Sequence, residues 1–257
     1  MDLQLSDKVA IVSGASRGIG RAIAETLGAE GMRLVVAARS RDQLDDLATS
    51  LPAGCLVQAV DLRDAGAPEA VVEAAVGHFG RLDLVVNNAG ATRRGDFLAL
   101  PDVDWDDGFR LKFFAAMRFC RAAWPHLQAG QGSIINIVGI GGRTASAAFT
   151  IGGAVNAALL NLTKALADRG VAEGVRVNAI NPGSIATDRL QGRLRSFASE
   201  RGIDLASAEV AMAESLGIAR FGAPADIARI VAFLASPQSR FCHGAIVDVD
   251  GGETRTL

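Results

Sequence analysis

Three glycines near the start of the chain have the spacing and setting of a phosphate-binding turn. Gly14, Gly18 and Gly20 follow a short apolar run. That run, residues 8–12, is typical of a buried parallel strand, and residues 21–27 have helical spacing. Glycines let the backbone approach a pyrophosphate, and the N-terminus of a helix offers free N–H groups with a partial positive charge. This setting favours dinucleotide binding over an ordinary tight turn.

Two arginines near this turn favour the phosphorylated form of the cofactor. Arg17 lies inside the glycine turn, and Arg39 follows a second apolar run, residues 33–38. An NAD site usually has an acid here, about 20 residues after the glycines, to bind the ribose hydroxyls. Two guanidinium groups suit a 2′-phosphate instead, through bidentate charge-assisted hydrogen bonds. We therefore expect NADP(H) rather than NAD(H). The alternative is that Arg39 only begins the solvated face of the next helix.

Residues that commonly transfer protons or bind metals are sparse in this chain. There is no tyrosine, so a tyrosine acid–base is excluded. The three histidines are scattered, and no cluster of histidine, cysteine and carboxylate side chains predicts a metal site. Cys55, Cys120 and Cys242 are far apart and odd in number. We expect them to be buried free thiols of a cytoplasmic protein.

Composition and charge narrow the classes of partner. The 257 residues are 49% hydrophobic and 21% charged, with 29 glycines, which suits a compact α/β protein with many tight turns. The net charge of −2 provides no excess of positive charge to attract nucleic acid or an anionic membrane. No apolar run reaches the about 20 residues that cross a bilayer, and the N-terminus carries no visible secretory signal. We expect a small-molecule ligand.

Apolar strands alternate with amphipathic helices along the chain. Beyond those already named, the sequence predicts strands at residues 55–60, 82–86 and 246–249, and helices at residues 42–51, 68–80, 101–127 and 227–234. This alternation is typical of a Rossmann fold, a doubly wound parallel sheet of about seven strands with helices on both faces. No linker or repeat divides the chain, so we predict a single domain over residues 1–257.

The motifs of the chain together resemble the short-chain dehydrogenase/reductase family. Besides the glycine turn, they are Asp61–Leu62, Asn87-Asn88-Ala89-Gly90, residues 132–137, residues 175–183 and residues 249–252. They stand in the family's order and spacing and cover nearly the whole chain. The resemblance implies an oxidoreductase that transfers a hydride between a nicotinamide cofactor and a carbonyl or alcohol. It also implies a homo-oligomer, a dimer or tetramer.

The resemblance assigns cofactor contacts to particular residues of this sequence. The turn from Pro182 to Thr187 would hold the nicotinamide carboxamide, and Asp61 would bind the adenine amino group unless it caps a helix. Residues 188–216 would form an amphipathic lid over the substrate. The full expected set of cofactor-binding residues is Gly14, Ser16, Arg17, Gly18, Ile19, Gly20, Arg39, Asp61, Leu62, Asn88, Ala89, Gly90, Pro182, Gly183, Ile185 and Thr187.

Other residues stand where the family carries its catalytic groups. The family uses a serine, a tyrosine and a lysine, with an asparagine from the preceding long helix, to move a proton and to stabilise the developing oxyanion. By spacing, these four positions fall on Gly139, Gly152, Asn156 and Lys112 respectively. We therefore expect a divergent member that lacks all four groups. The space left at Gly152 must be filled by a ligand or by another side chain.

Lys112 is the candidate for the missing proton donor. Its long side chain would enter the pocket beside the position of the absent lysine, and burial lowers the pKa of an ammonium. We expect it to hydrogen-bond the amide of Asn156, which would support it, and to act as proton donor or oxyanion clamp. The alternative is a lysine that only binds a carboxylate or a carbonyl inside the helix.

The sequence allows two roles for three further arginines and three functions for the whole protein. Arg93, Arg94 and Arg143 lie near the nicotinamide end of the expected cleft, where they would bind a carboxylate or phosphate or else serve as surface charge. The chain is an NADP-dependent oxidoreductase with an altered proton donor, a non-redox enzyme such as a lyase or hydratase, or a catalytically silent nucleotide-binding or partner subunit. Fold alone does not decide among these functions.

Overall fold

One sheet of seven parallel strands forms the centre of the computed structural model, which describes residues 1–255. Its strands are β1 Val9–Ser13, β2 Arg33–Ala38, β3 Cys55–Ala59, β4 Leu84–Asn87, β5 Ser133–Ile137, β6 Arg176–Pro182 and β7 Ile246–Val249. They follow the order β3-β2-β1-β4-β5-β6-β7, and every neighbouring pair is parallel. The predicted doubly wound sheet is confirmed.

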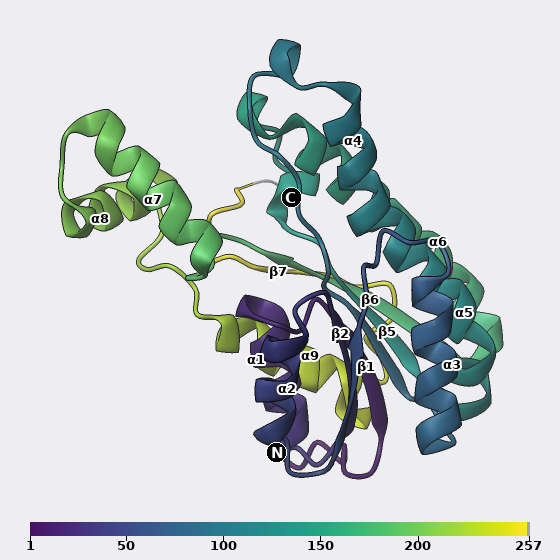
Figure 1. Cartoon of the computed structure of the whole chain (residues 1–257). Helices are drawn as coiled ribbons and strands as arrows, with labels where there is room; N and C mark the ends of the chain where they lie inside the picture. The colour runs from purple at the N-terminus through teal and green to yellow at the C-terminus, as the bar shows by residue number, and fades with distance from the viewer. Residues whose placement is uncertain (256–257) are drawn as a thin grey trace.

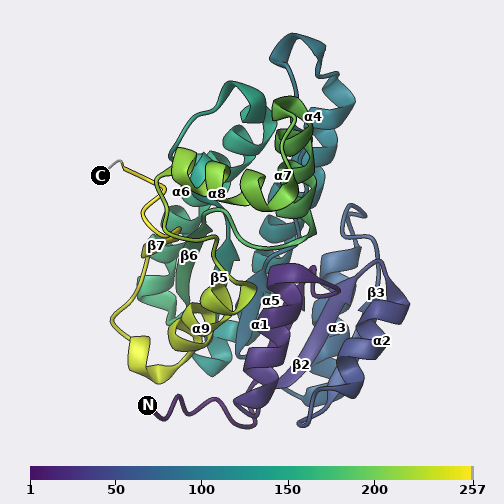
Figure 2. The same ribbon diagram turned by 90° about the vertical axis from the view of Figure 1, so that its left-hand side faces the viewer.

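Helices cover both faces of the sheet (Figure 1). On one face lie α1 Gly18–Ala29, α2 Arg41–Thr49 and α9 Pro224–Ala235, and on the other lie α3 Ala67–Phe79, α5 Ala115–Gly130 and α6 Thr150–Glu173. Figure 2 shows the same layers from the side, with α1 and α9 in front of the sheet. Successive residues of β1 serve opposite layers, because Ala10 and Val12 pack with α1 and α9 while Val9 and Ile11 pack with α3 and α5.

The strand order reverses between β1 and β4, which pair directly. The connections from these two strands leave towards opposite faces, so a crevice opens at their carboxyl ends. Open α/β sheets bind their ligands in such a crevice. The glycine turn after Ser13 and the segment after Asn87 both begin there. The fold therefore brings the predicted cofactor residues of both segments together.

The predicted long helix over residues 101–127 is interrupted in its middle. It consists of α4 Asp102–Gly108, a π-helical segment Phe109–Phe114, and α5, which ends at Gly130. A Cβ on Gly108 would lie 2.8 Å from Cγ2 of Ile151, so the glycine allows α4 to pack closely on α6. π-Helical segments are rare and often occur at functional sites. Lys112 lies within this one.

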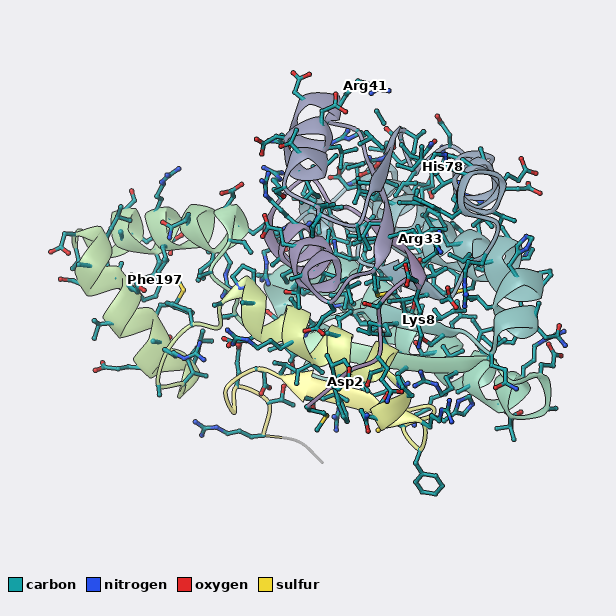
Figure 3. The ribbon with its side chains drawn as sticks, turned by 90° about the horizontal axis from the view of Figure 1, so that it is seen from below. Asp2, Lys8, Arg33, Arg41, His78 and Phe197 are labelled. Atoms are coloured by element: carbon teal, nitrogen blue, oxygen red, sulfur yellow. The ribbon has the colours of Figure 1, made fainter. Side chains whose placement is uncertain are left out.

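Two helices stand away from the sheet. They are α7 Asp188–Arg201 and α8 Leu205–Leu216, which confirms the amphipathic helices expected over residues 188–216. Their apolar sides enclose a separate small core that includes Leu190, Leu194 and Met212. Figure 3, seen from below, shows Phe197 in this pair at the edge of the molecule, far from Lys8 and Arg33 at the starts of β1 and β2.

The cysteines differ in part from the expectation of three buried thiols. Cys120 is buried, but Cys55 and Cys242 are only half-buried, and all three are free. Burial raises the pKa of the Cys55 thiol to about 11 and that of the Cys120 thiol to about 12, so neither is a reactive thiolate at neutral pH. Within residues 1–255, no helix is long and apolar enough to span a bilayer, and no three metal-binding side chains cluster.

Candidate active site

Backbone geometry makes the glycine turn a cradle that side chains would block. Gly14 and Gly18 have φ angles of 66° and 58°, which side chains rarely adopt. A Cβ on Gly20 would lie 2.2 Å from the carbonyl oxygen of Gly14. No side chain caps the N-terminus of α1 at Arg17, so its first N–H groups are available to a ligand. This arrangement fits the pyrophosphate of a dinucleotide.

Asn88 and Ser13 fasten the cradle to the end of β4. The hydroxyl of Ser13 accepts hydrogen bonds from the backbone N–H of Asn88 at 2.9 Å and of Ala89 at 3.0 Å. The Asn88 amide donates to the carbonyl oxygens of Ser13 at 3.0 Å and of Gly14 at 3.1 Å. Asn88 and Ala89 therefore hold the turn in shape. Sequence reasoning assigned both residues to the cofactor site without this detail.

The turn after β6 lies opposite the glycine turn. A Cβ on Gly18 would lie 3.3 Å from Cγ2 of Thr187, so the two expected cofactor segments face each other closely. A Cβ on Gly183 would lie 2.6 Å from Cβ of Asp250, and Ile185 forms a β-bridge with Gly222. The segment from Pro182 to Thr187 is thus fixed by the end of the chain and by the segment before α9.

The two arginines expected at the 2′-phosphate have different surroundings. Arg17 forms an exposed ion pair at 3.2 Å with Asp188, the first residue of α7. Arg39 is exposed directly after β2 and forms no ion pair within residues 1–255. The structure therefore leaves Arg39 available to an anion, whereas Arg17 has a competing carboxylate.

Asp61, at the end of β3, serves as a local cap in this structure. Its Oδ1 accepts a hydrogen bond from the backbone N–H of Arg63 at 3.0 Å and faces the Arg63 guanidinium at 3.4 Å. The same guanidinium binds Asp107, and this bond holds the pKa of the Asp107 carboxyl below its usual range. Leu62 is buried beneath this turn. Asp61 therefore closes a turn and does not cap a helix, since α3 begins at Ala67 with Gly66 as its N-cap, and the second carboxylate oxygen of Asp61 remains available.

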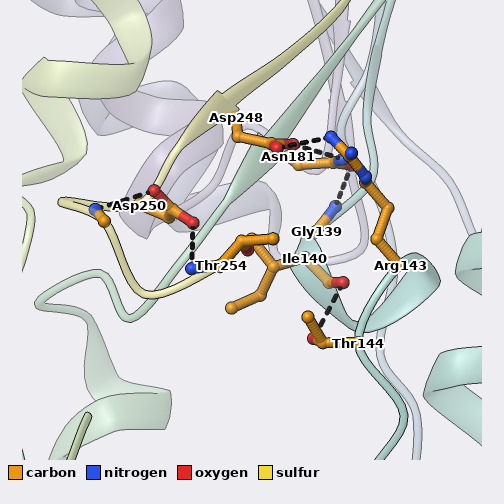
Figure 4. Close-up of polar contacts among 9 residues, drawn as sticks. Gly139, Ile140, Arg143, Thr144, Asn181, Asp248, Asp250 and Thr254 are labelled. Atoms are coloured by element: carbon orange, nitrogen blue, oxygen red, sulfur yellow. Dashed lines mark hydrogen bonds and ion pairs between the residues drawn. The ribbon is translucent and has the colours of Figure 1, made fainter. Parts of the chain in front are cut away.

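A chain of polar contacts fixes the turn after β5 (Figure 4). The backbone N–H of Gly139, whose φ is 122°, donates to Oδ1 of Asn181 at 3.3 Å. Nδ2 of Asn181 donates to Asp248 at 2.8 Å, and the other oxygen of Asp248 accepts from Arg143 at 2.6 Å. Arg143 is therefore engaged in holding the turn, and Asp248 competes with an anionic substrate for its guanidinium.

Asn156 points towards the same turn with half of its amide unpaired. The residue is 2% exposed, and its Nδ2 donates to the carbonyl oxygen of Gly139 at 3.4 Å. Its Oδ1 is buried and has no hydrogen-bond partner within residues 1–255. An unpaired buried amide oxygen costs free energy, so this oxygen is a natural acceptor for a water or a ligand.

The ring of Phe149 fills the space beside Gly152. A Cβ on Gly152 would lie 2.0 Å from Cζ of this ring. The guanidinium of Arg94 stacks on the ring, with its Cζ 4.0 Å from the ring centroid. Phe149 also lines a cavity of about 490 Å³ that extends along the exposed side of α6 at Ala154. Sequence reasoning missed this filling residue. The only available signal was an aromatic residue one helical turn before a glycine.

Lys112 reaches from the π-helical segment to the end of β5. Its ammonium donates a hydrogen bond to the carbonyl oxygen of Val138, the residue before Gly139. The side chain passes under Gly90, where a Cβ would lie 2.9 Å from Cδ of Lys112. The expected hydrogen bond to the Asn156 amide is therefore wrong. Lys112 binds a carbonyl, as the alternative interpretation stated, but that carbonyl belongs to the residue that follows β5 and not to the helix.

Burial lowers the pKa of Lys112 to about 7, and the positive charge of Arg189 contributes in the same direction. Arg189, on α7, donates a hydrogen bond to the carbonyl oxygen of Gly90 and so lies directly over this lysine. The bond from Lys112 to Val138 favours the ammonium form and works against the decrease. The result is a lysine that exchanges a proton near neutral pH, at the carboxyl end of the sheet.

Comparisons with known proteins place the chain in a family. A family model described as enoyl-(acyl carrier protein) reductase matches residues 14–254. An uncharacterized oxidoreductase of Mycobacterium tuberculosis is 36% identical over 258 residues, which cover 98% of this chain and 94% of that protein. The short-chain reductase NovJ of Streptomyces niveus is 36% identical over 250 residues, with coverages of 96% and 94%.

A solved structure agrees with these matches. The crystal structure of L-sorbose reductase from Gluconobacter frateurii, complexed with NADPH and L-sorbose, has a TM-score of 0.95 and 33% identity and covers all of both chains. The chain belongs to the short-chain dehydrogenase/reductase family, and its relatives are reductases and dehydrogenases. The family resemblance of the sequence motifs is confirmed.

The close contact between Gly152 and Phe149 gives a test of how the site is packed. The variant Gly152→Ala is expected to destabilise the protein by about 1–3 kcal/mol, because the new methyl group displaces the ring. This cost outweighs the gain of about 1 kcal/mol that alanine brings to a helix. Urea unfolding followed by circular dichroism measures the difference.

Two comparisons make this test specific. Gly77→Ala in α3 adds a methyl group to open space, so it should be neutral or stabilising. In a Phe149→Ala background, Gly152→Ala should no longer destabilise. Equal effects of Gly152→Ala in both backgrounds would show that the ring does not fill this space.

Proposed function

We propose that the protein is an NADP(H)-dependent oxidoreductase that interconverts a carbonyl compound and its alcohol, with Lys112 as the proton donor. The observation that carries the proposal is the position of the Lys112 ammonium, at the Val138 carbonyl and one residue before Gly139. Its pKa of about 7 suits proton transfer near neutral pH. Membership of an oxidoreductase family supports the reaction class.

The proposal includes the loss of the family's usual catalytic groups. By spacing, the positions of the family's serine, tyrosine and lysine fall on Gly139, Gly152 and Asn156. The absence of tyrosine from the chain supports this assignment. The Phe149 ring occupies the space beside Gly152, so a phenol at that position would have no room without a rearrangement.

The cofactor is proposed to lie in the crevice between the glycine turn and the turn after β6. The free N–H groups at the start of α1 would bind the pyrophosphate, Arg39 the 2′-phosphate, and the segment from Pro182 to Thr187 the carboxamide. NADPH, when bound, supplies the hydride for reduction of the carbonyl carbon. Helices α7 and α8 would act as a lid, since Arg17–Asp188 and Arg189–Gly90 already connect α7 to the two sides of the crevice.

Lys112 would complete the reaction on the oxygen side. As negative charge develops on the carbonyl oxygen, the ammonium donates a hydrogen bond and then its proton, which yields the alcohol and a neutral amine. The amine regains a proton from solvent. Asn156 is proposed as a supporting residue, because its unpaired buried Oδ1 can accept a hydrogen bond from the ammonium or from a bridging water.

The pH dependence of activity tests the role of Lys112. Reduction needs the protonated lysine, so kcat/KM for reduction should be constant below about pH 7 and fall about tenfold per pH unit above it. Oxidation of the alcohol needs the neutral amine, so its kcat/KM should rise to about pH 7 and then level off. Lys112→Met should lose about 100-fold or more in kcat and lose the inflection.

Lys164→Met provides the matched control for this experiment. Lys164 also donates to a backbone carbonyl, that of Gly244, at 2.5 Å, but it lies on the outer side of α6. This variant should keep the activity and the pH profile. If Lys112→Met retained the kcat and the inflection near pH 7, Lys112 would be removed from the chemistry.

Cofactor preference is tested by fluorescence titration with NADPH and NADH. Arg39→Ala should raise the Kd for NADPH about tenfold or more while changing the Kd for NADH less than about twofold, since only NADPH carries the 2′-phosphate. Arg41→Ala is the control, because Arg41 lies two residues further on and is paired with Asp45 at 3.5 Å. Equal weakening of both cofactors by Arg39→Ala would refute the assignment. Tight NADPH binding without turnover on a broad panel of carbonyls and alcohols would refute the oxidoreductase itself.

A further inference from the structure

Two arginines from different segments, Arg94 and Arg193, lie near the crevice and form no ion pair within residues 1–255. Arg94 comes from the segment after β4, and Arg193 comes from α7 on the other side of the crevice. Arg94 is exposed, but partial loss of water around its guanidinium lowers its pKa, and the positive charge of Arg193 lowers it further, so the two guanidinium groups are near enough to repel each other.

The contacts of each arginine fix its position. The flat face of the Arg94 guanidinium lies on the Phe149 ring at 4.0 Å, so its edge donors remain available. Arg193 is half-buried and donates a hydrogen bond to the hydroxyl of Ser184 at 3.4 Å. Ser184 belongs to the turn after β6, which would hold the nicotinamide. Arg94 therefore lies beside the filled space at Gly152, and Arg193 lies beside the turn that would hold the nicotinamide.

One acid, Glu253, acts on Arg94 but already has hydrogen-bond partners of its own. The negative charge of the Glu253 carboxylate raises the pKa of Arg94, so the two side chains interact electrostatically. Its two oxygens, however, accept hydrogen bonds from Ser184, one from the backbone N–H at 2.8 Å and one from the hydroxyl at 3.3 Å. Glu253 thus reduces the positive charge of the pair without forming an ion pair with either arginine. Donors on both guanidinium groups remain for a ligand.

Neighbouring arginines do not share these properties. Arg93 forms an ion pair with Asp104 at 3.4 Å, and Arg143 is bound to Asp248. The sequence placed Arg93, Arg94 and Arg143 together as candidates for an anion site. The structure separates Arg94 from the other two and adds Arg193, which lies within the segment 188–216 expected to form the lid.

We propose that Arg94 and Arg193 bind a carboxylate of the substrate, so that the protein acts on short oxo acids or the corresponding hydroxy acids. A carboxylate accepts two parallel hydrogen bonds from the edge of a guanidinium, and a single such group between the arginines relieves their repulsion. This substrate class rests on the proposed oxidoreductase function, since it assumes that the reacting carbonyl lies between this pair and Lys112.

The experiment compares each acid with its neutral amide, which has the same skeleton and shape. The probes are pyruvate and pyruvamide, acetoacetate and acetoacetamide, and levulinate and levulinamide, so that the carbonyl lies one, two or three bonds further from the charge along the series. Binding to the protein saturated with NADP⁺, which cannot reduce the carbonyl, is measured by calorimetry, and turnover is measured separately by NADPH absorbance. At least one acid should bind about 10- to 100-fold more tightly than its amide.

Variants connect this preference to the two arginines. Arg94→Gln and Arg193→Gln should each reduce the affinity for the preferred acid about tenfold or more, close to that of its amide, without changing the Kd for NADPH. Arg93→Gln, at the adjacent and already paired residue, should keep the full preference. The Kd for NADPH is measured for every variant, and an unchanged value shows that the weaker binding of the acid does not come from loss of the fold.

The outcomes separate this inference from the proposed function. Acid-selective binding that depends on both arginines but gives no turnover would support the carboxylate site and overturn the oxidoreductase. Turnover of neutral ketones without preference for any acid would support the oxidoreductase and overturn the carboxylate site. The carboxylate site would also be overturned if no acid bound more tightly than its amide in any of the three acid–amide pairs. The same holds if the preference for the acid survived both Arg94→Gln and Arg193→Gln.

Discussion

Burial of one ammonium group at the carboxyl end of β5 is the interaction on which the site depends. Lys112 crosses from the helical layer to the Val138 carbonyl only because Gly90, above its path, has no side chain. Loss of water around the ammonium brings its pKa to about 7, and Arg189 adds repulsion from above. Removing water from a charged ammonium costs free energy, and strongly shifted lysines of this kind are common in functional sites.

Glycines shape the space around this lysine because they have no side chain. Gly139 adopts a φ of 122° and lets the Asn156 amide approach its carbonyl oxygen. Gly152 makes room for the Phe149 ring, and this ring in turn supports Arg94. Hydrogen bonds through Asn181 and Asp248 also hold the turn at Gly139 against the sheet, so this turn has a defined structure without the family's usual catalytic groups. Lys112 and Asn156 thus both reach the turn after β5, the one at Val138 and the other at Gly139.

Much of the fold was predictable from the sequence because local signals agree with one another. The glycine turn, the alternation of strands and helices and the family motifs all indicated the same sheet, and the strands lie where they were expected. The interruption of the long helix at residues 109–114 was not predictable, since the sequence there has ordinary helix-forming residues. The partners of Arg143 and Lys112 could not be predicted either, because Asp248 and Val138 come from distant parts of the chain. Long-range contacts of this kind depend on the packed fold and not on local pattern.

The most direct test of the central claim is a titration of Lys112 itself. The chain contains three lysines, Lys8, Lys112 and Lys164, so selective ¹³C labelling at lysine Cε gives a small set of NMR signals, and Lys112→Met assigns the one of interest. The account predicts that this signal titrates near pH 7, well below the about 10.4 of a free lysine, in the folded protein. A Lys112 signal that titrates near 10.4 would contradict the account, because such a lysine would be a solvated surface charge and not a buried proton donor.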